Sequence, residues 1–275
     1  MDTINIREVF HKKNPKAAKM LPGFIYRYIE KIVHLKEIND AVPLLGDKYG
    51  LDFVKAVIEY FHINIHVKGQ ENIPTEGRNI FVANHPLGGL DGIVFAHVVG
   101  KIHPNIQFLV NDILMNLENL DSIFIPVNKH GKQSVEYVRR IEETYTSDAQ
   151  MLNFPAGLCS RKVKGRIIDL EWKKSFISKA IQHKRDIVPV HIDGRNSNFF
   201  YNLSNLRGWL GVKTNIEMFY LVDEMFKQKN KDMTLIFGKP ILFTAFDKSL
   251  NAKEWAKKVK NHIYTLPEGN FEPFK

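Results

Sequence analysis

His85 and Asp91 are the pair of side chains in this sequence best suited to acid–base catalysis. They stand in the segment Phe81–Gly92, FVANHPLGGLDG, in which a short apolar run ends at Asn84. A neutral imidazole can take a proton from an alcohol near pH 7, and a carboxylate on its other ring nitrogen fixes the tautomer and stabilises the imidazolium. The pair therefore predicts general-base activation of a hydroxyl. Taken alone, the spacing is equally compatible with a helix-capping Asp91 and a turn residue at His85.

A second group of polar residues follows another apolar run. The segment Phe154–Lys162, FPAGLCSRK, places a glycine turn at Gly157 ahead of Ser160 and Arg161. Backbone N–H groups and cations in such a turn suit an anion such as phosphate or carboxylate. The alternative is an ordinary basic surface loop. Cys159 is interpreted as a small buried side chain, because no local His or Asp arrangement marks it as a nucleophile.

Strands and helices are expected to alternate from His62 onward and to hold these residues in place. Period-two or continuous apolar runs predict strands at 63–67, Asn79–Ala83, Ile106–Val110, Ile123–Val127, Met151–Phe154, Ile187–Ile192 and Thr234–Phe237. Helices are expected at Gly92–Lys101, Lys132–Thr146, Trp172–Arg185, Glu217–Lys229 and Ala252–Tyr264. The alternation predicts an α/β fold around a mixed, largely parallel sheet flanked by helices. His85 then follows a strand at the edge where such sheets carry their sites, and Asp91 stands at the N-cap of the next helix.

Residues 1–60 are expected to form a helical, basic segment ahead of an α/β domain spanning 61–275. Lys19–Leu35 has apolar residues at near-helical spacing, and a second helix is expected at Leu51–Tyr60. These helices either pack on the domain or lie in a lipid interface. Arg195–Thr214 shows weak periodicity and is predicted to be a surface excursion or lid.

The composition of this chain of 275 residues limits the environments and partners that it is suited to. A hydrophobic content of 44% with 25% charged residues is ordinary for a globular protein. The formal net charge of +9 favours anionic partners such as phospholipid surfaces, nucleic acid or an acidic carrier protein. A single cysteine fits a reducing compartment, and neither a signal peptide nor a membrane-spanning run is predicted.

With its neighbours, the His85 segment resembles the glycerolipid acyltransferase family, which includes lysophosphatidic acid acyltransferases. In that family an Asn-His pair is followed by Asp after four residues, whereas here five residues separate His85 from Asp91. Gly88-Gly89 in the spacer accept backbone angles that absorb an extra residue.

Three further segments resemble motifs of the same family, in the same order. Ser122–Val127 resembles the second motif, with Lys129 standing close to the position of the usual basic residue. Phe154-Pro155 with Gly157, Ser160 and Arg161 resembles the third motif, in which Ala156 replaces the usual glutamate. Ile187–Ile192, which contains Pro189, resembles the strand that lines the acyl site. The changes at the spacer and at Ala156 point to the bacterial hemolysin-like subgroup, whose members include O-acyltransferases that make amino-acid-headed lipids.

The resemblance implies transfer of a fatty acyl group from an acyl carrier protein or CoA thioester to the hydroxyl of a lysolipid. The acceptor is expected to be a lyso-amino-acid lipid or lysophosphatidate. The implied catalytic residues are His85 and Asp91. The implied substrate-binding residues are Asn84, Lys129, Phe154, Pro155, Gly157, Ser160, Arg161 and Pro189. No metal or other cofactor is implied, and the expected location is peripheral, on the inner, cytoplasmic face of the cell membrane, against anionic lipid.

Two rival functions remain open at this point. The basic charge permits a non-enzymatic module that binds membrane or nucleic acid, but no helix-turn-helix, zinc-finger or RNP-type pattern is present, so nucleic acid is not expected as a partner. A hydrolase using the same His–Asp pair is the other rival, although the sequence contains no G-x-S-x-G nucleophile elbow.

Overall fold

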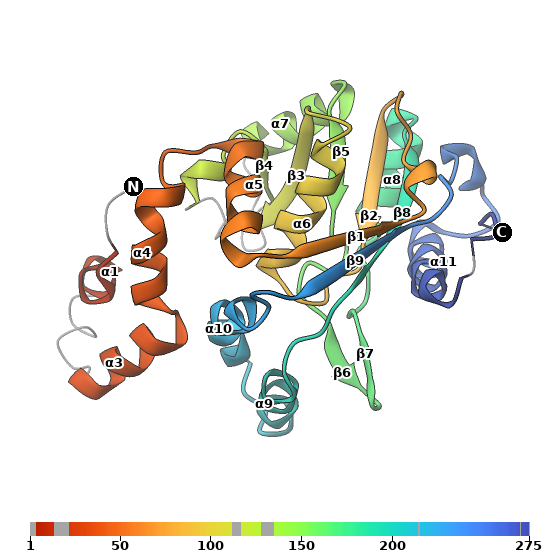
Figure 1. Ribbon diagram of the computed structural model, residues 1–275. Coiled ribbons are helices and arrows are strands. Elements are labelled where there is room, and N and C mark those ends of the chain that lie inside the picture. Colours follow the sequence, from red (N-terminus) through yellow and green to blue (C-terminus); the bar gives the residue numbers. More distant parts are fainter. Residues whose placement is uncertain are drawn as a thin grey trace.

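A computed structural model describes residues 4–13, 22–111, 117–127, 135–213, 215–269 and 271–274. In these ranges seven strands form one sheet, in the order β1-β9-β8-β2-β5-β3-β4 (Figure 1). The strands are β1 (Asn64–Lys68), β2 (Asn79–Ala83), β3 (Ile106–Asn111), β4 (Phe124–Val127), β5 (Gln150–Asn153), β8 (Asp186–Asp193) and β9 (Asp232–Phe237). All neighbours are parallel except β8 and β9. The predicted fold class is confirmed, and each predicted strand lies within two residues of an observed one.

The middle of the sheet brings three strand ends together. β2 is buried along its whole length between β5 and β8, with Phe81 opposite both Leu152 and Val188. Because these three strands are parallel, their carboxyl ends meet at one edge of the sheet. The residues that follow β2 and β5 are therefore neighbours in space.

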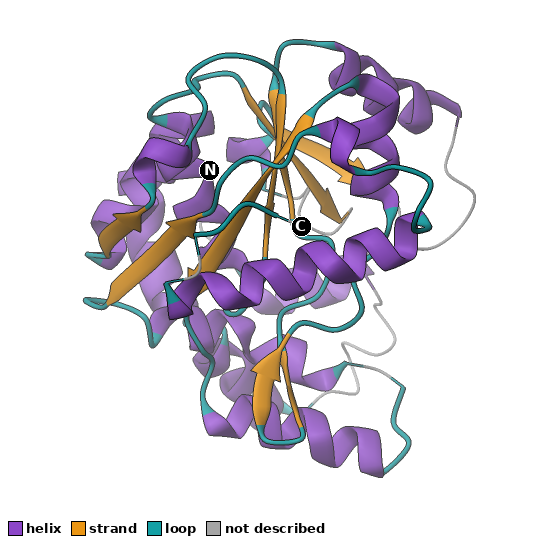
Figure 2. Ribbon diagram, turned by 90° about the vertical axis from the view of Figure 1, so that its right-hand side faces the viewer, coloured by secondary structure: helices purple, strands orange, loops and turns teal. Residues whose placement is uncertain are grey.

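Helices cover both faces of the sheet. On one face, α5 (Gly50–Phe61) and α6 (Gly89–Gly100) contribute to the larger hydrophobic core. On the other face, α7 (Val135–Thr146), α8 (Ser175–His183) and α11 (Ala252–Thr265) contribute to a second core. Figure 2 looks onto the face that α11 covers. The layered arrangement is the one expected when parallel strands carry apolar residues on both faces.

The amino-terminal helices differ in how they join the domain. α1 (Ile6–Lys13), α3 (Gly23–Ile32) and α4 (Leu35–Leu45) lie to one side of the sheet (Figure 1), and residues 19–21 of the predicted Lys19–Leu35 helix fall outside the described ranges. α5 instead buries Val54 and Phe61 in the same core as the sheet. The predicted boundary between residues 60 and 61 therefore falls in the last turn of a helix that belongs to the core of the domain.

Arg195–Thr214, predicted to be a surface excursion or lid, contains a helix that the sequence pattern did not predict, α9 (Asn198–Trp209). Ser197 caps this helix by accepting a hydrogen bond from the N–H of Phe200 at 3.3 Å. Phe200 and Tyr201 are buried while Trp209 is 82% exposed. Apolar side chains on both faces hide the helical period, and the sequence pattern is weak for that reason.

Two other connecting segments have a structure that differs from the prediction. β6 (Arg161–Val163) and β7 (Arg166–Ile168) form an antiparallel hairpin where a basic loop was the alternative. The predicted helix Glu217–Lys229 is divided into the 3₁₀ turn η4 (Ile216–Tyr220) and α10 (Leu221–Phe226). Short 3₁₀ turns also occur at η1 (Gln70–Asn72), η3 (Glu118–Leu120), η5 (Phe243–Ala245) and η6 (Leu266–Glu268). In the part of the chain that the structure describes, no helix has the length and apolar character needed to cross a bilayer.

Candidate active site

His85 lies just beyond β2, at the sheet edge where β5 and β8 also end. Asn84, which precedes it, is buried and ties β2 to β8 through a pair of hydrogen bonds. Its Nδ2 donates to the carbonyl of Ile192 at 2.9 Å, and its Oδ1 accepts from the N–H of Ile192 at 2.7 Å. Asn84 thus fixes the direction in which the chain leaves the sheet, and this direction determines where His85 lies.

Asp91 lies within hydrogen-bonding distance of the His85 ring, with 3.0 Å between Asp91 Oδ2 and His85 Nδ1. The same oxygen accepts the N–H groups of Leu87 and Gly88 at 2.7 and 3.0 Å. The five-residue spacer closes because Gly88 adopts a φ of +97°, which glycine accepts without strain. Asp91 is the third residue of α6 and Gly88 its N-cap, so the expectation of Asp91 at the N-cap was wrong. The Asp91 carboxylate reaches back to the amides of the N-cap, Gly88, and of Leu87 before it.

The two side chains differ in their contact with solvent. Asp91 is fully buried, whereas the His85 side chain is 17% exposed. Burial raises the pKa of Asp91, and the hydrogen bond and positive charge of His85 oppose that shift. With Nδ1 donating to the carboxylate, the lone pair of His85 resides on Nε2. Nε2 is therefore the atom that can accept a proton from a substrate.

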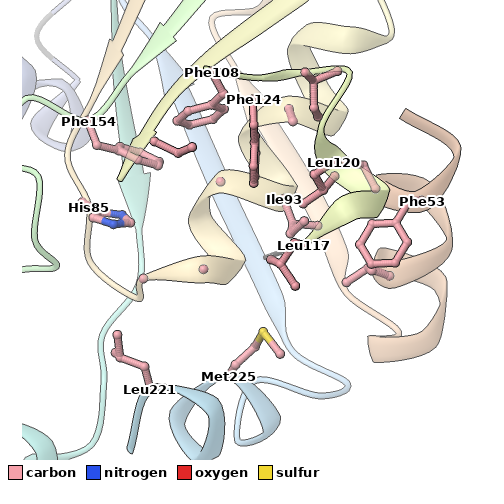
Figure 3. A pocket seen from close by; sticks show the side chains of 18 of the residues that line it. Phe53, His85, Ile93, Phe108, Leu117, Leu120, Phe124, Phe154, Leu221 and Met225 are labelled. Carbon is pink, nitrogen blue, oxygen red and sulfur yellow. The ribbon is translucent and has the colours of Figure 1, made fainter. Parts of the chain in front are cut away.

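Phe154 stacks on the His85 ring with centroids 4.1 Å apart and an interplanar angle of 13°. Both side chains line a cavity of about 880 Å³. Figure 3 shows His85 and Phe154 on one side of this pocket and Phe53, Leu117 and Leu120 on the other. The remaining lining is largely apolar and comes from α4, α5, α6, α10 and the ends of β3 and β5. A long hydrocarbon chain fits such a lining, because it leaves few polar groups without partners.

Asp169 holds the backbone of His85 and was not singled out from the sequence. Its Oδ1 accepts the His85 N–H at 3.2 Å and the Ser160 hydroxyl at 2.6 Å, and its Oδ2 accepts the Trp172 indole N–H at 2.9 Å. The N–H of Ser160 in turn donates to the carbonyl of His85 at 2.7 Å. No sequence pattern marks Asp169, because its partners are distant along the chain.

Comparison with known proteins decides the family. The family model described as Acyltransferase matches residues 8–270. The chain belongs to this acyltransferase family. It is 49% identical over 264 residues to a lyso-glycine lipid O-acyltransferase of Bacteroides thetaiotaomicron, covering 96% of this chain and 97% of the relative. A protein of the same name from Phocaeicola vulgatus is 45% identical, with 96% and 95% covered. Among solved structures, the 1-acyl-sn-glycerophosphate (LPA) acyltransferase PlsC from Thermotoga maritima matches with a TM-score of 0.49 and 19% identity, covering 79% of this chain and 78% of that one.

The family resemblance seen in the sequence and the expectation of an O-acyltransferase are thus confirmed. The other predicted site residues of this acyltransferase differ in where they lie. Phe154, Pro155 and Gly157 line the cavity, and Ser160 is buried against Asp169. Pro189 lies inside β8, opposite Val82, and Lys129 falls outside the described residues.

Arg161 is buried in an ion pair and does not line the cavity. Its Nη2 donates to Glu217 Oε1 at 2.9 Å, and Arg207 Nε donates to Glu217 Oε2 at 2.9 Å. Binding an anionic head group at Arg161 therefore requires this pair to open, and the predicted role stays a prediction.

Cys159 of the acyltransferase lines the cavity but is buried, and that burial raises the pKa of its thiol. A thiol held in its neutral form is a poor nucleophile. Within the described ranges, no group of three or more His, Cys, Asp and Glu side chains is arranged to hold a metal ion.

Proposed function

We propose that this acyltransferase moves a fatty acyl group from an acyl thioester to the free hydroxyl of a lyso-glycine lipid. The observation that carries the proposal is the His85–Asp91 contact of 3.0 Å at the wall of an apolar cavity of about 880 Å³. The names of two relatives at 49% and 45% identity support the choice of acceptor.

In the proposed reaction, His85 acts as a general base and then as a general acid. Nε2 takes the proton of the acceptor hydroxyl while the hydroxyl oxygen attacks the thioester carbonyl. Asp91 stabilises the imidazolium that forms. When the tetrahedral intermediate collapses, the C–S bond breaks, the ester remains, and the imidazolium returns its proton to the departing thiolate. The enzyme ends in its starting state without a covalent acyl-enzyme.

The proposed donor is acyl carrier protein or acyl-CoA. Both are anionic, and the chain carries a formal net charge of +9, which favours encounter with such donors. Either thioester supplies the same electrophilic carbonyl, so the chemistry at His85 does not depend on the choice.

We also propose that the enzyme works at the cytoplasmic face of an anionic membrane, as a peripheral protein. Both the acceptor and the product are lipids. Around the carboxyl end of α9, Leu206, Trp209 and Leu210 are 52%, 82% and 59% exposed. Apolar side chains presented together with nearby cations such as Lys213 are suited to the interface of such a membrane.

The decisive assay supplies purified enzyme with palmitoyl-CoA or palmitoyl carrier protein, with and without N-(β-hydroxypalmitoyl)glycine. The expected result is a doubly acylated glycine lipid that forms only when the acceptor is present. Release of free palmitate at the same rate with or without acceptor would instead establish a hydrolase. Lipid mass spectrometry on cells lacking the protein then identifies the natural acceptor by the species that disappears.

A further inference from the structure

The cavity beside His85 is lined by few charged side chains. Among the described residues that line it, Lys173 is the one Lys or Arg and Glu118 the one Asp or Glu. Glu118 adjoins Leu117, which Figure 3 places across the pocket from His85. Lys173 lines the cavity together with Pro155, Gly157 and Ser175, and Pro155 adjoins Phe154, which Figure 3 shows beside His85. Of the two charged residues of this lining, the cationic one is therefore the one connected to the His85 side.

Backbone contacts fix Lys173 near the catalytic histidine. The N–H of Lys173 donates to the carbonyl of Pro155 at 3.1 Å, next to Phe154, which stacks on His85. The preceding residue, Trp172, donates to Asp169, the carboxylate that also accepts the His85 N–H. The backbone of Lys173 is thus held by the same short network that holds His85, and its side chain is exposed.

The ammonium of Lys173 has no carboxylate partner among the described residues. Other lysines of the described chain do form ion pairs, for example Lys227 with Asp223 at 2.7 Å and Lys253 with Glu171 at 2.6 Å. The adjoining loop, Pro155–Leu158, contributes no acidic side chain. An unpaired cation at the polar end of an otherwise apolar cavity is suited to the anionic end of an amphiphile.

We propose that Lys173 binds the carboxylate of the acceptor head group, assisted by the hydroxyl of Ser175. This inference rests on the proposed function, in which the acceptor is a glycine-headed lysolipid. A glycine joined to the lipid through its nitrogen keeps a free carboxylate, which is ionised at neutral pH. Anchoring that carboxylate at Lys173 places the head group at the His85 end and leaves the hydrocarbon chain to the apolar walls. Lys173 is then a residue that determines acceptor specificity.

The test compares two acceptors that differ only in head-group charge, N-(β-hydroxypalmitoyl)glycine and the corresponding neutral glycinamide. Steady-state rates are measured for the wild type and for K173M, K173R and K174M. Lys174 is a matched control, because it is the next residue and does not line the cavity. We expect K173M to raise KM for the acid about ten- to a hundredfold and to leave KM for the amide unchanged, as expected for loss of a charge-assisted hydrogen bond. K173R should keep most of the preference for the acid, and K174M should behave as the wild type.

The inference is overturned if K173M leaves both KM values unchanged or raises both equally. A smaller folded fraction lowers kcat and leaves KM unchanged, so partial misfolding does not imitate the expected result. If the wild type acylates neither acceptor, the proposed function fails and this inference fails with it. If the wild type acylates both acceptors with equal KM, the function stands and only the role of Lys173 is rejected.

Discussion

The carboxylate of Asp169 accepts a hydrogen bond from the backbone N–H of His85, although the two residues are 84 positions apart in the sequence. Asp169 is 2% exposed and also accepts hydrogen bonds from Ser160 and Trp172. His85, the proposed base, is therefore held by two hydrogen bonds: Asp91 binds its ring, and Asp169 binds its backbone N–H. We therefore propose that Asp169 is a positioning residue for the reaction.

Replacing Asp169 by Asn is expected to lower kcat while KM changes little. The amide supplies one acceptor oxygen in place of two, so at least one of the three buried donors loses its partner and His85 shifts. A misplacement of that kind costs up to about a hundredfold in rate. Steady-state kinetics on D169N check this, with the exposed Asp148→Asn as the control. A D169N enzyme with the kcat of the wild type would contradict the positioning role.

Replacing Glu217 by Ala is expected to destabilise the fold. Glu217 is fully buried between Arg161 and Arg207, and its removal leaves the largely buried Arg161 guanidinium without its carboxylate. Breaking a buried pair in this way costs about 3–5 kcal/mol of unfolding free energy. Urea unfolding measures the loss. The matched change at Glu136, an exposed residue that pairs with Arg139, should alter the unfolding free energy by less than about 0.5 kcal/mol. Equal effects at the two sites would be inconsistent with this interpretation.

The pKa of Asp91 predicts a particular dependence of stability on pH. Because burial raises this pKa above its ordinary value, the folded protein binds the proton more tightly than the unfolded chain does. The contribution of Asp91 to stability is then largest below the ordinary pKa of Asp and is lost as the pH rises through the raised one.

Asp91→Asn removes this titration, so the stability of the wild type relative to D91N should fall as pH rises across that window. Urea unfolding of both proteins at a series of pH values checks the sign. A difference that stays constant, or that grows in favour of the wild type with rising pH, would show that the pKa of Asp91 is not raised.

Trp209 is expected to contribute to membrane binding, because it is 82% exposed at the end of α9 beside other exposed apolar residues. Trp209→Ser should weaken partitioning to vesicles of anionic phospholipid by about tenfold, through loss of buried apolar surface. Vesicle sedimentation measures the binding. Leu242→Ser is the control, since Leu242 is 59% exposed in the loop after β9. Equal partitioning of the two variants would locate the binding surface elsewhere.

The sheet was predictable from the sequence because its signals are local. β2 spans Asn79–Ala83 as predicted, since an apolar run there is bounded by polar residues. The contact between His85 and Asp91 also follows from a short segment. α9 was missed, because its buried and exposed apolar residues obscure the helical period.

The parts of the site that were not predicted depend on contacts between distant segments. Asp169 acquires its role only when the chain after β7 returns to His85, and Arg161 meets Glu217 across 56 positions. Lys173 lines the cavity beside Pro155, whose carbonyl accepts its N–H. In each case the residue type gives no signal until the fold supplies its neighbours.

The role of His85 as the general base is tested by the rate of acyl transfer in His85→Ala, with acceptor binding measured in parallel. We expect transfer to fall by about a hundredfold or more, as loss of a general base requires, while binding of N-(β-hydroxypalmitoyl)glycine is retained. A His85→Ala enzyme that still transfers acyl groups at a rate within a few-fold of the wild type would contradict the proposed mechanism.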